Sequence, residues 1–251
     1  AALATGGYKV PGGQTTETEL YDGTSWTEVS DLNTARYGLG SAGADNTSAL
    51  TFGGNEPSTA ACESWNGSAW TEVADLSTAR LKMGSAGIQT SALAFGGAVG
   101  PNAQTKCELW NGSSWTEVAD ITGAKEAISG TGADNTSALA FGGSGPSTAT
   151  EEWTGAGAAL GAWSTSTAMN TSRNIGGSAG TASNTLAFGG GVNGGATANT
   201  EHWDGSSWTE LANLNSGRGQ MTGTGSVYTA ALATGGGSPN ALNEQWNGSS
   251  W

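Results

Sequence analysis

The residues that could carry acid–base chemistry recur at fixed positions along the chain. Five basic residues each stand ten positions after an aromatic residue: Arg36, Arg80, Lys125, Arg173 and Arg218. Six glutamates each stand two positions before another aromatic residue: Glu19, Glu63, Glu108, Glu151, Glu201 and Glu244. As catalysts they would form rings of acid and base, and as structural groups they would form one ion pair in each repeat. We expect the ion pairs, because a catalytic set breaks a repeat whereas packing reproduces it.

Groups suited to metal or nucleophilic chemistry are few. His202 is the only histidine, so the chain lacks the His pair or Cys/His cluster that a copper or zinc site requires. No nucleophile is spaced with a base that would activate it. We therefore expect no enzyme activity, no metal and no cofactor. Cys62 and Cys107 hold equivalent positions in neighbouring repeats, beyond the reach of a disulfide, and we expect two free thiols, which favours a reducing compartment.

The 11 tryptophans also recur in a fixed phase. Exposed aromatic faces stack on sugars, whereas a buried indole removes about 150–250 Å² from water. Because the chain is poor in Leu and Ile, and because the phase is fixed, we expect the tryptophans to form the core.

The elements that position these residues are marked by six Gly-Gly pairs: Gly6-Gly7, Gly53-Gly54, Gly96-Gly97, Gly142-Gly143, Gly189-Gly190 and Gly235-Gly236. A leucine precedes each pair by three positions, and the alternation Leu-x-Phe in the middle copies predicts a strand that ends at the pair. Two aromatic residues then flank an Asn-Gly or Asp-Gly turn, which predicts a hairpin. The fourth copy carries a longer connection, from Thr154 to Ala162.

A Gly/Ala-rich segment such as residues 37–43 adds an inner strand to each repeat. Four antiparallel strands in about 45 residues form one propeller blade. We predict an all-β single domain, residues 1–251, that is a six-bladed β-propeller of four-stranded antiparallel blades. The expected blades are residues 1–32, 33–76, 77–121, 122–169, 170–214 and 215–251. The inner segment occurs only five times, so the first blade should lack it, and a five-bladed or an open, incomplete six-bladed ring is the alternative.

The Leu-x-Phe-Gly-Gly strand followed by an aromatic residue, a turn and a tryptophan resembles the kelch repeat over essentially the whole chain. Its aromatic residues lie closer together than in the usual kelch spacing. The wording Leu-Ala-Phe-Gly-Gly and Trp-Asn-Gly-Ser-Ser-Trp-Thr-Glu is also similar to repeats of marine bacteriophage structural and tail proteins. The first resemblance implies a propeller that binds other molecules, and the second implies a virion-associated role.

Charge excludes two classes of partner. The chain has 8 basic and 21 acidic residues, a net charge of −13, which repels phosphate backbones and anionic membranes. No stretch approaches the roughly 20 apolar residues of a membrane helix. We expect neither nucleic-acid binding nor membrane insertion.

The connection after each Gly-Gly pair is the part of the repeat that varies, and variable loops on a rigid scaffold are common binding sites. The candidate ligand-binding residues are Tyr8, Lys9, Gln14, Asn55, Glu56, Asn102, Gln104, Asn193 and Asn240. We expect a non-catalytic adhesion module of a phage tail or fibre, virion-borne or extracellular, that recognises a glycan or protein on a cell surface. The alternatives are a structural or capsid-decoration module bound to other virion subunits, and a cytoplasmic kelch-type interaction scaffold.

Overall fold

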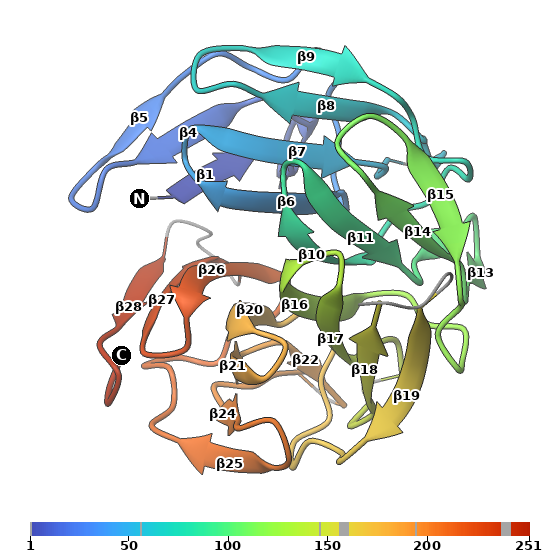
Figure 1. The fold of residues 1–251 in the computed structure, drawn as a ribbon. Helices are drawn as coiled ribbons and strands as arrows, with labels where there is room; N and C mark the ends of the chain where they lie inside the picture. The colour runs from blue at the N-terminus through green and yellow to red at the C-terminus, as the bar shows by residue number, and fades with distance from the viewer. Residues whose placement is uncertain (1, 56, 146, 156–160, 194, 237–241) are drawn as a thin grey trace. The chain divides into compact units, whose positions relative to one another are not determined.

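The computed structural model describes residues 2–55, 57–145, 147–155, 161–193, 195–236 and 242–251. Its regular elements are all β-strands, and six antiparallel sheets form the blades of a six-bladed β-propeller (Figure 1). The predicted fold class is confirmed, and the five-bladed alternative is wrong. The chain divides into two compact units, Ala1–Glu126 and Ala127–Trp251, with three blades each.

The first unit contains two complete blades and one of three strands. The first blade consists of β1 (Ala2–Thr5), β4 (Thr18–Tyr21) and β5 (Trp26–Glu28). The second consists of β6 (Gly40–Asp45), β7 (Ser48–Phe52), β8 (Cys62–Trp65) and β9 (Trp70–Val73). The third consists of β10 (Gly84–Ile88), β11 (Ser91–Phe95), β14 (Cys107–Trp110) and β15 (Trp115–Val118).

The second unit repeats this plan. The fourth blade consists of β16 (Ile128–Asp134), β17 (Ser137–Gly142), β18 (Thr150–Thr154) and β19 (Ala162–Ser166). The fifth consists of β20 (Gly177–Thr181), β21 (Asn184–Phe188), β24 (Thr200–Trp203) and β25 (Trp208–Leu211). The sixth has three strands, β26 (Met221–Val227), β27 (Ala230–Gly235) and β28 (Asn243–Trp246). The first blade lacks the inner strand, as expected.

Among the connections after Gly-Gly that lie in the described residues, three form small two-stranded hairpins. They are β2 (Tyr8–Lys9) with β3 (Gly13–Gln14), β12 (Ala98–Val99) with β13 (Asn102–Ala103), and β22 (Gly191–Val192) with β23 (Gly195–Ala196). They belong to the first, third and fifth blades. In the second and fourth blades the described residues form short turns instead, so the repeat alternates between neighbouring blades.

The small residues of the inner strands make room for the phenylalanines of the next strand. A Cβ atom on Gly84 would lie 2.2 Å from the Phe95 ring, and one on Gly177 would lie 2.3 Å from the Phe188 ring. Real Cβ atoms do not come so close, so glycine is required where the second strand carries a large buried ring. This contact explains the Gly/Ala composition of the inner strands.

The inner strand of the second blade begins later than predicted, at Gly40 rather than at residue 37. Gly38 has φ +62°, a left-handed conformation that interrupts an extended strand. The carbonyl oxygen of Tyr37 accepts a hydrogen bond from Asn55 N at 2.8 Å, across to the Gly-Gly turn. Residues 37–39 therefore link the blades and are not part of the ladder.

The tryptophans form the core, as predicted. Five of them, Trp65, Trp110, Trp153, Trp203 and Trp246, are at most 3% exposed. Each pairs with the aromatic residue across its hairpin, with ring centroids 5.4–5.5 Å apart. In the fourth blade Trp153 still pairs with Trp163 in register, although the connection between them is longer.

The hairpin turns between these aromatic pairs are held by one side-chain oxygen. Oδ1 of Asn66 accepts hydrogen bonds from the amides of Ser68 and Ala69, each at 3.0 Å. Asp22 and Asp204 accept the equivalent bonds, and these bonds lower the pKa of each carboxyl group to about 2. The predicted Asn-Gly and Asp-Gly hairpins are confirmed.

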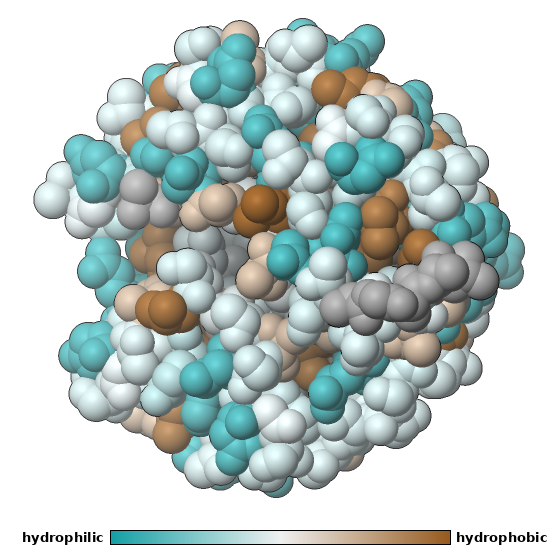
Figure 2. Space-filling view, in the orientation of Figure 1, coloured by the Kyte–Doolittle hydropathy of each residue, from teal (hydrophilic) through white to brown (hydrophobic). Residues whose placement is uncertain are grey.

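Figure 2 shows a surface on which pale and teal residues predominate and apolar residues lie scattered. The exposed large hydrophobic side chains of the described residues are Tyr8, Val10, Val99, Val227 and Leu242. Over the same residues, no helix is long and apolar enough to cross a bilayer.

Candidate functional site

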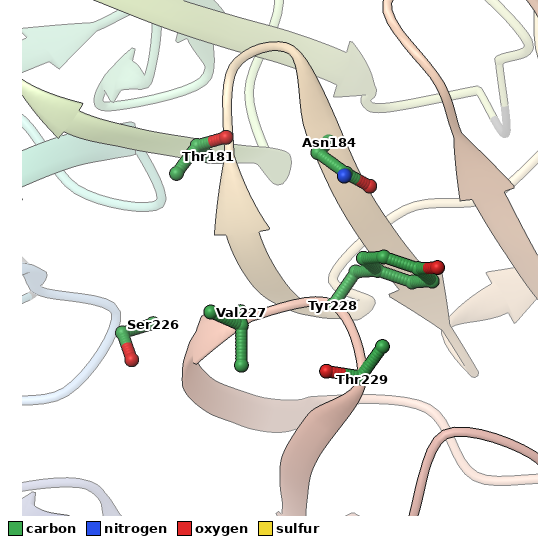
Figure 3. Close-up of a pocket in the computed structure, with 6 residues that line it drawn as sticks. All are labelled: Thr181, Asn184, Ser226, Val227, Tyr228 and Thr229. Atoms are coloured by element: carbon green, nitrogen blue, oxygen red, sulfur yellow. The ribbon is translucent and has the colours of Figure 1, made fainter.

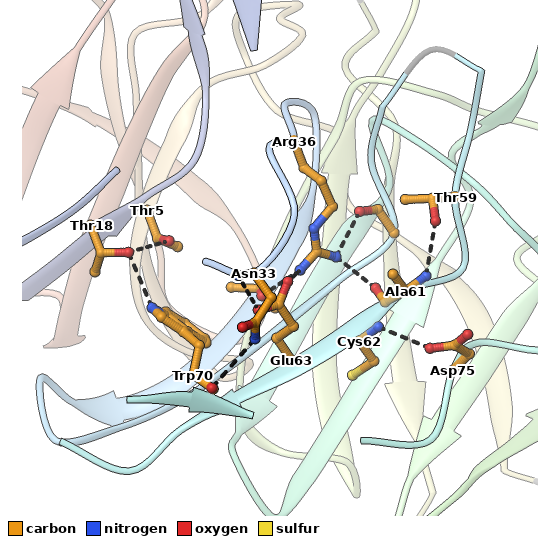
Figure 4. A network of polar contacts seen from close by, with 12 residues as sticks. Thr5, Thr18, Asn33, Arg36, Thr59, Ala61, Cys62, Glu63, Trp70 and Asp75 are labelled. Atoms are coloured by element: carbon orange, nitrogen blue, oxygen red, sulfur yellow. Dashed lines mark hydrogen bonds and ion pairs between the residues drawn. The ribbon is translucent and has the colours of Figure 1, made fainter. Parts of the chain in front are cut away.

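A buried arginine–glutamate contact clamps the Gly-Gly turn of each blade that it reaches. Arg36 Nη2 donates to Glu63 Oε1 at 2.7 Å, and Arg36 Nη1 donates to the carbonyl oxygens of Gly53 and Ala61 at 3.2 and 2.6 Å (Figure 4). The other carboxylate oxygen of Glu63 accepts two bonds from Asn33, in the segment between β5 and β6. Both partners of the ion pair are at most 1% exposed.

The same clamp joins three more blade contacts. The pairs are Arg80–Glu108 at 2.8 Å, Arg173–Glu201 at 2.6 Å and Arg218–Glu244 at 2.8 Å. Burial lowers the pKa of the Arg173 guanidinium, and the charge of Glu201 acts in the opposite direction. The predicted ion pairs are confirmed at these four positions. Three of them are fully buried, and in the fourth the Glu244 side chain is 12% exposed.

Each clamp acts on two blades at once. The backbone carbonyl of Arg36 accepts a bond from Gly7 N in the first blade at 2.7 Å, while its side chain binds the second blade. The carbonyl of Arg80 likewise accepts a bond from Gly54 N at 2.7 Å. In the second, third, fifth and sixth blades, the variable connections therefore leave from turns whose positions are fixed by charge-assisted bonds.

A second contact between neighbouring blades involves the cysteines. Trp70 Nε1 donates to Thr18 Oγ1 at 3.1 Å, and Trp208 Nε1 donates to Thr150 Oγ1 at 3.2 Å. Cys62 occupies this threonine position and faces the buried Nε1 of Trp115, so this indole meets a sulfur, which is a weak acceptor, instead of a hydroxyl. Cys62 and Cys107 are buried, and both are thiols outside any disulfide, as predicted. Burial raises the pKa of the Cys62 thiol to about 12, with smaller opposite effects from Trp115 and Arg36, so the thiol is unreactive.

Replacing Cys62 with threonine is expected to stabilise the protein by about 1 kcal/mol, because a hydroxyl would accept the Trp115 indole proton. The free energy of unfolding in urea measures the change. Cys62→Ala is the control, since it removes the sulfur without adding an acceptor and should destabilise the protein. A Cys62→Thr variant no more stable than Cys62→Ala would contradict the expectation.

The candidate binding residues of the first blade lie together on one hairpin. Tyr8 and Lys9 are in β2 and Gln14 is in β3, and all three side chains are exposed. Lys9 forms an ion pair with Glu17 in the same blade. Tyr8 is 58% exposed and stands edge-on to Tyr37, with ring centroids 5.4 Å apart.

Asn55 joins this group through the backbone. Its amide donates to the carbonyl of Tyr37, and its own φ is +75°. The Oδ1 atom of Asn55 is buried and has no hydrogen-bond partner among the described residues. In the first unit, the Tyr8 ring thus contacts the ring of Tyr37 and the Asn55 amide binds its carbonyl, and sequence reasoning did not select Tyr37.

The other candidates lie apart from this group. Asn102 is exposed on β13, and Gln104 donates to the carbonyls of Asn102 and Ala103 within its own hairpin. Asn193 is exposed at the turn of the β22–β23 hairpin in the second unit. Glu56 and Asn240 lie outside the described residues.

Sequence reasoning missed a second group at the other end of the fifth and sixth blades. A cavity there is lined by residues of the turns between the first and second strands, among them Asn184 and Tyr228. Two features of the sequence could have indicated this group. The turns differ from repeat to repeat, and the single histidine, His202, belongs to the fifth repeat. Within the described part of the chain, no three His, Cys, Asp or Glu side chains are grouped so as to hold a metal ion.

The site could also be compared with those of related proteins if the chain matched any known family. No model of a known protein family matches the chain, and no curated protein matches it significantly.

Proposed function

We propose that this protein is a non-catalytic adhesion module that binds a glycan on a cell surface through the Gly-Gly end of its blades. The propeller fold fits a non-catalytic binding module. The observation that carries the proposal is the β2–β3 hairpin, where Tyr8 is 58% and Val10 82% exposed. The hairpin follows Gly7, whose amide donates to the carbonyl of Arg36 at 2.7 Å.

Rigid presentation of an aromatic side chain favours recognition. Contact with Tyr37 restrains the Tyr8 ring, so little conformational entropy is lost when a ligand covers it. Tyrosine offers an apolar face and a hydroxyl together, which suits both the C–H surface and the hydroxyls of a sugar.

The virion-associated part of the proposal rests on two segments of the repeat that are similar to repeats of bacteriophage proteins, Leu-Ala-Phe-Gly-Gly and Trp-Asn-Gly-Ser-Ser-Trp-Thr-Glu. A tail or fibre module acts outside the cell, where a net charge of −13 favours solubility and disfavours non-specific binding to anionic surfaces. Adhesion to neutral glycans is compatible with that charge.

The test combines a glycan array with adsorption of the labelled protein to bacterial cells. A Tyr8→Ser, Val10→Ser double variant is expected to lose at least about tenfold in affinity, since central aromatic contacts contribute about 2 kcal/mol or more. A Thr27→Ala, Thr116→Ala double variant is the control, because both side chains are exposed on the outer strands β5 and β15, away from the Gly-Gly turns. An array without hits, or equal adsorption by both variants, would refute the proposal.

A further inference from the structure

At the end of the blades opposite the Gly-Gly turns, the turn between the first two strands of one blade rests on the blade before it. Between the second and third blades this contact is a closed polar link. Gln89 Nε2 donates to Ser64 Oγ at 2.9 Å and also to the carbonyl of Trp65, while Ser48 Oγ donates to Gln89 Oε1 at 2.9 Å. One glutamine therefore fills the space between these two blades.

The fifth and sixth blades place different residues at the same three positions. Tyr228 replaces Gln89, seven positions before a Gly-Gly pair in each case, and the serines are replaced by Asn184 and His202. The Tyr228 ring stacks on His202 with centroids 4.0 Å apart and planes inclined by 22°. His202 Nε2 lies 2.6 Å from Asn184 Oδ1.

A solvent-accessible cavity of about 230 Å³ lies next to the stacked Tyr228 ring. Between the second and third blades, the equivalent position is occupied by the Gln89 side chain. The walls of the cavity are Thr181, Asn184, Ser226, Val227, Tyr228 and Thr229 (Figure 3). Figure 3 shows the Tyr228 side chain extending from its turn towards strand β21, which carries Asn184. The cavity lies within the second unit, between two consecutive blades.

Two buried indoles show independently that the turns of these blades differ from the others. In the second, third and fourth blades the tryptophan that ends the third strand donates Nε1–H to the carbonyl of Asn46, Gln89 or Asn135, at 2.8–3.0 Å. The equivalent Nε1 atoms of Trp203 and Trp246 have no hydrogen-bond partner among the described residues. The turns at Ala182 and Tyr228 thus do not close onto their own blades as the other turns do.

The charges around the cavity favour a neutral ligand. No wall residue is an Asp, Glu, Lys or Arg. Burial lowers the pKa of His202, against a smaller opposite effect of Asp204, so the ring is neutral at pH 7. Bonds from Ser206 and Ser207 already occupy the Asp204 carboxylate. Because Oδ1 of Asn184 faces the histidine, its amide Nδ2 remains to donate to a ligand.

We propose that this cavity binds one residue of a neutral carbohydrate. Tyr228 and Val227 supply an apolar wall for a C–H face, while the amide of Asn184 and the hydroxyls of Thr181, Ser226 and Thr229 supply partners for sugar hydroxyls. The volume suits a single hexose ring, since sites for drug-sized ligands measure about 300–1,000 Å³. The inference uses other residues than the Gly-Gly end and stands without the proposed function.

The single histidine makes a direct test possible, because its ring protons give one isolated NMR signal. The full chain is titrated at constant pH with the methyl glycosides of glucose, galactose, mannose and N-acetylglucosamine. At least one of them is expected to shift the His202 signal saturably, with a millimolar dissociation constant. Methyl glucuronide and inorganic phosphate, as charged probes, are expected to give no saturable shift.

Two variants copy residues that the chain already tolerates at equivalent positions. Tyr228→Gln introduces the residue that the third blade has at this position, Gln89, and Asn184→Ser introduces the residue that the second blade has, Ser48. Each variant is expected to weaken binding at least tenfold and to leave thermal unfolding unchanged. Tyr8→Ser is the control, and it should leave this titration unchanged even where it abolishes cell adsorption. Three results would overturn the proposal: no saturable shift with any neutral glycoside, an affinity of both variants equal to that of the unaltered protein, or charged probes that bind as tightly as the neutral glycosides.

Discussion

Arg173→Ala is expected to lower the free energy of unfolding by about 3–5 kcal/mol, because it leaves a buried carboxylate without its counter-charge. The guanidinium is fully buried and bonds Glu201 Oε1 at 2.6 Å. It also satisfies the carbonyls of Gly189 and Asn199 at 3.0 and 2.9 Å. The substitution therefore removes a buried positive charge. It also removes the hydrogen bonds that the guanidinium donates to the Glu201 carboxylate and to these two carbonyl oxygens. Urea unfolding followed by tryptophan fluorescence measures the loss.

A surface ion pair is the control for this effect. Lys106 and Glu117 are 3.2 Å apart, with side chains 34% and 56% exposed, so Lys106→Ala is expected to cost only about 0–1 kcal/mol. Adding Glu201→Gln to Arg173→Ala should recover part of the lost free energy of unfolding, since the buried carboxylate without a counter-charge is then replaced by a neutral amide. A loss for Arg173→Ala no larger than that for Lys106→Ala would contradict a structural role for the clamp.

Trp203→Ala is expected to cost about 3–5 kcal/mol, as large-to-small changes in a well-packed core do. The indole is fully buried in a cluster with Leu139, Phe141 and Met169, and it pairs with Trp208 at 5.4 Å. The same loss is not expected at Tyr21, which holds the equivalent position in the first blade and is only partly buried. Thermal or urea unfolding compares Trp203→Ala with Tyr21→Ala.

Phenylalanine variants separate the packing of the indole from its hydrogen bond. Trp153 Nε1 donates to Asn135 O at 2.9 Å, whereas Trp203 Nε1 has no partner among the described residues. Trp153→Phe should therefore destabilise the protein by about 1 kcal/mol more than Trp203→Phe. If instead Trp203→Ala left stability intact and abolished sugar binding, the tryptophans would be binding platforms rather than core.

The repeated features were predictable from sequence because each appears several times in the same phase. A single Leu-x-Phe-Gly-Gly segment is a weak strand signal, but copies at spacings of 43–47 residues leave few architectures other than a propeller. The buried arginines and tryptophans followed by the same logic, since equivalent residues of a repeat occupy equivalent environments. The alternation of hairpins and short turns after Gly-Gly was not predicted, although the lengths of those connections differ in the sequence.

The start of the inner strand could not be read from composition. Residues 37–39 are continuous with the Gly/Ala-rich segment that follows them, and the bond from Asn55 to Tyr37 and the left-handed Gly38 show that they are not part of the strand. Likewise, the candidate residues of the Gly-Gly connections were found by their variability, whereas Tyr37 was not. Its importance depends on what packs against it from two separate connections.

By itself, then, the amino-acid sequence determined the blade, the aromatic core and the charged pairs, because these depend on short-range patterns that the copies repeat. It favoured six blades over five, and the structure excluded the five-bladed alternative. Only the tertiary structure decided which blade each arginine clamps and where the repeat leaves an open space. The cavity between Asn184 and Tyr228 joins turns that are more than forty residues apart in the chain. Its existence depends on whether a side chain such as Gln89 fills the space between two blades, which no local pattern records.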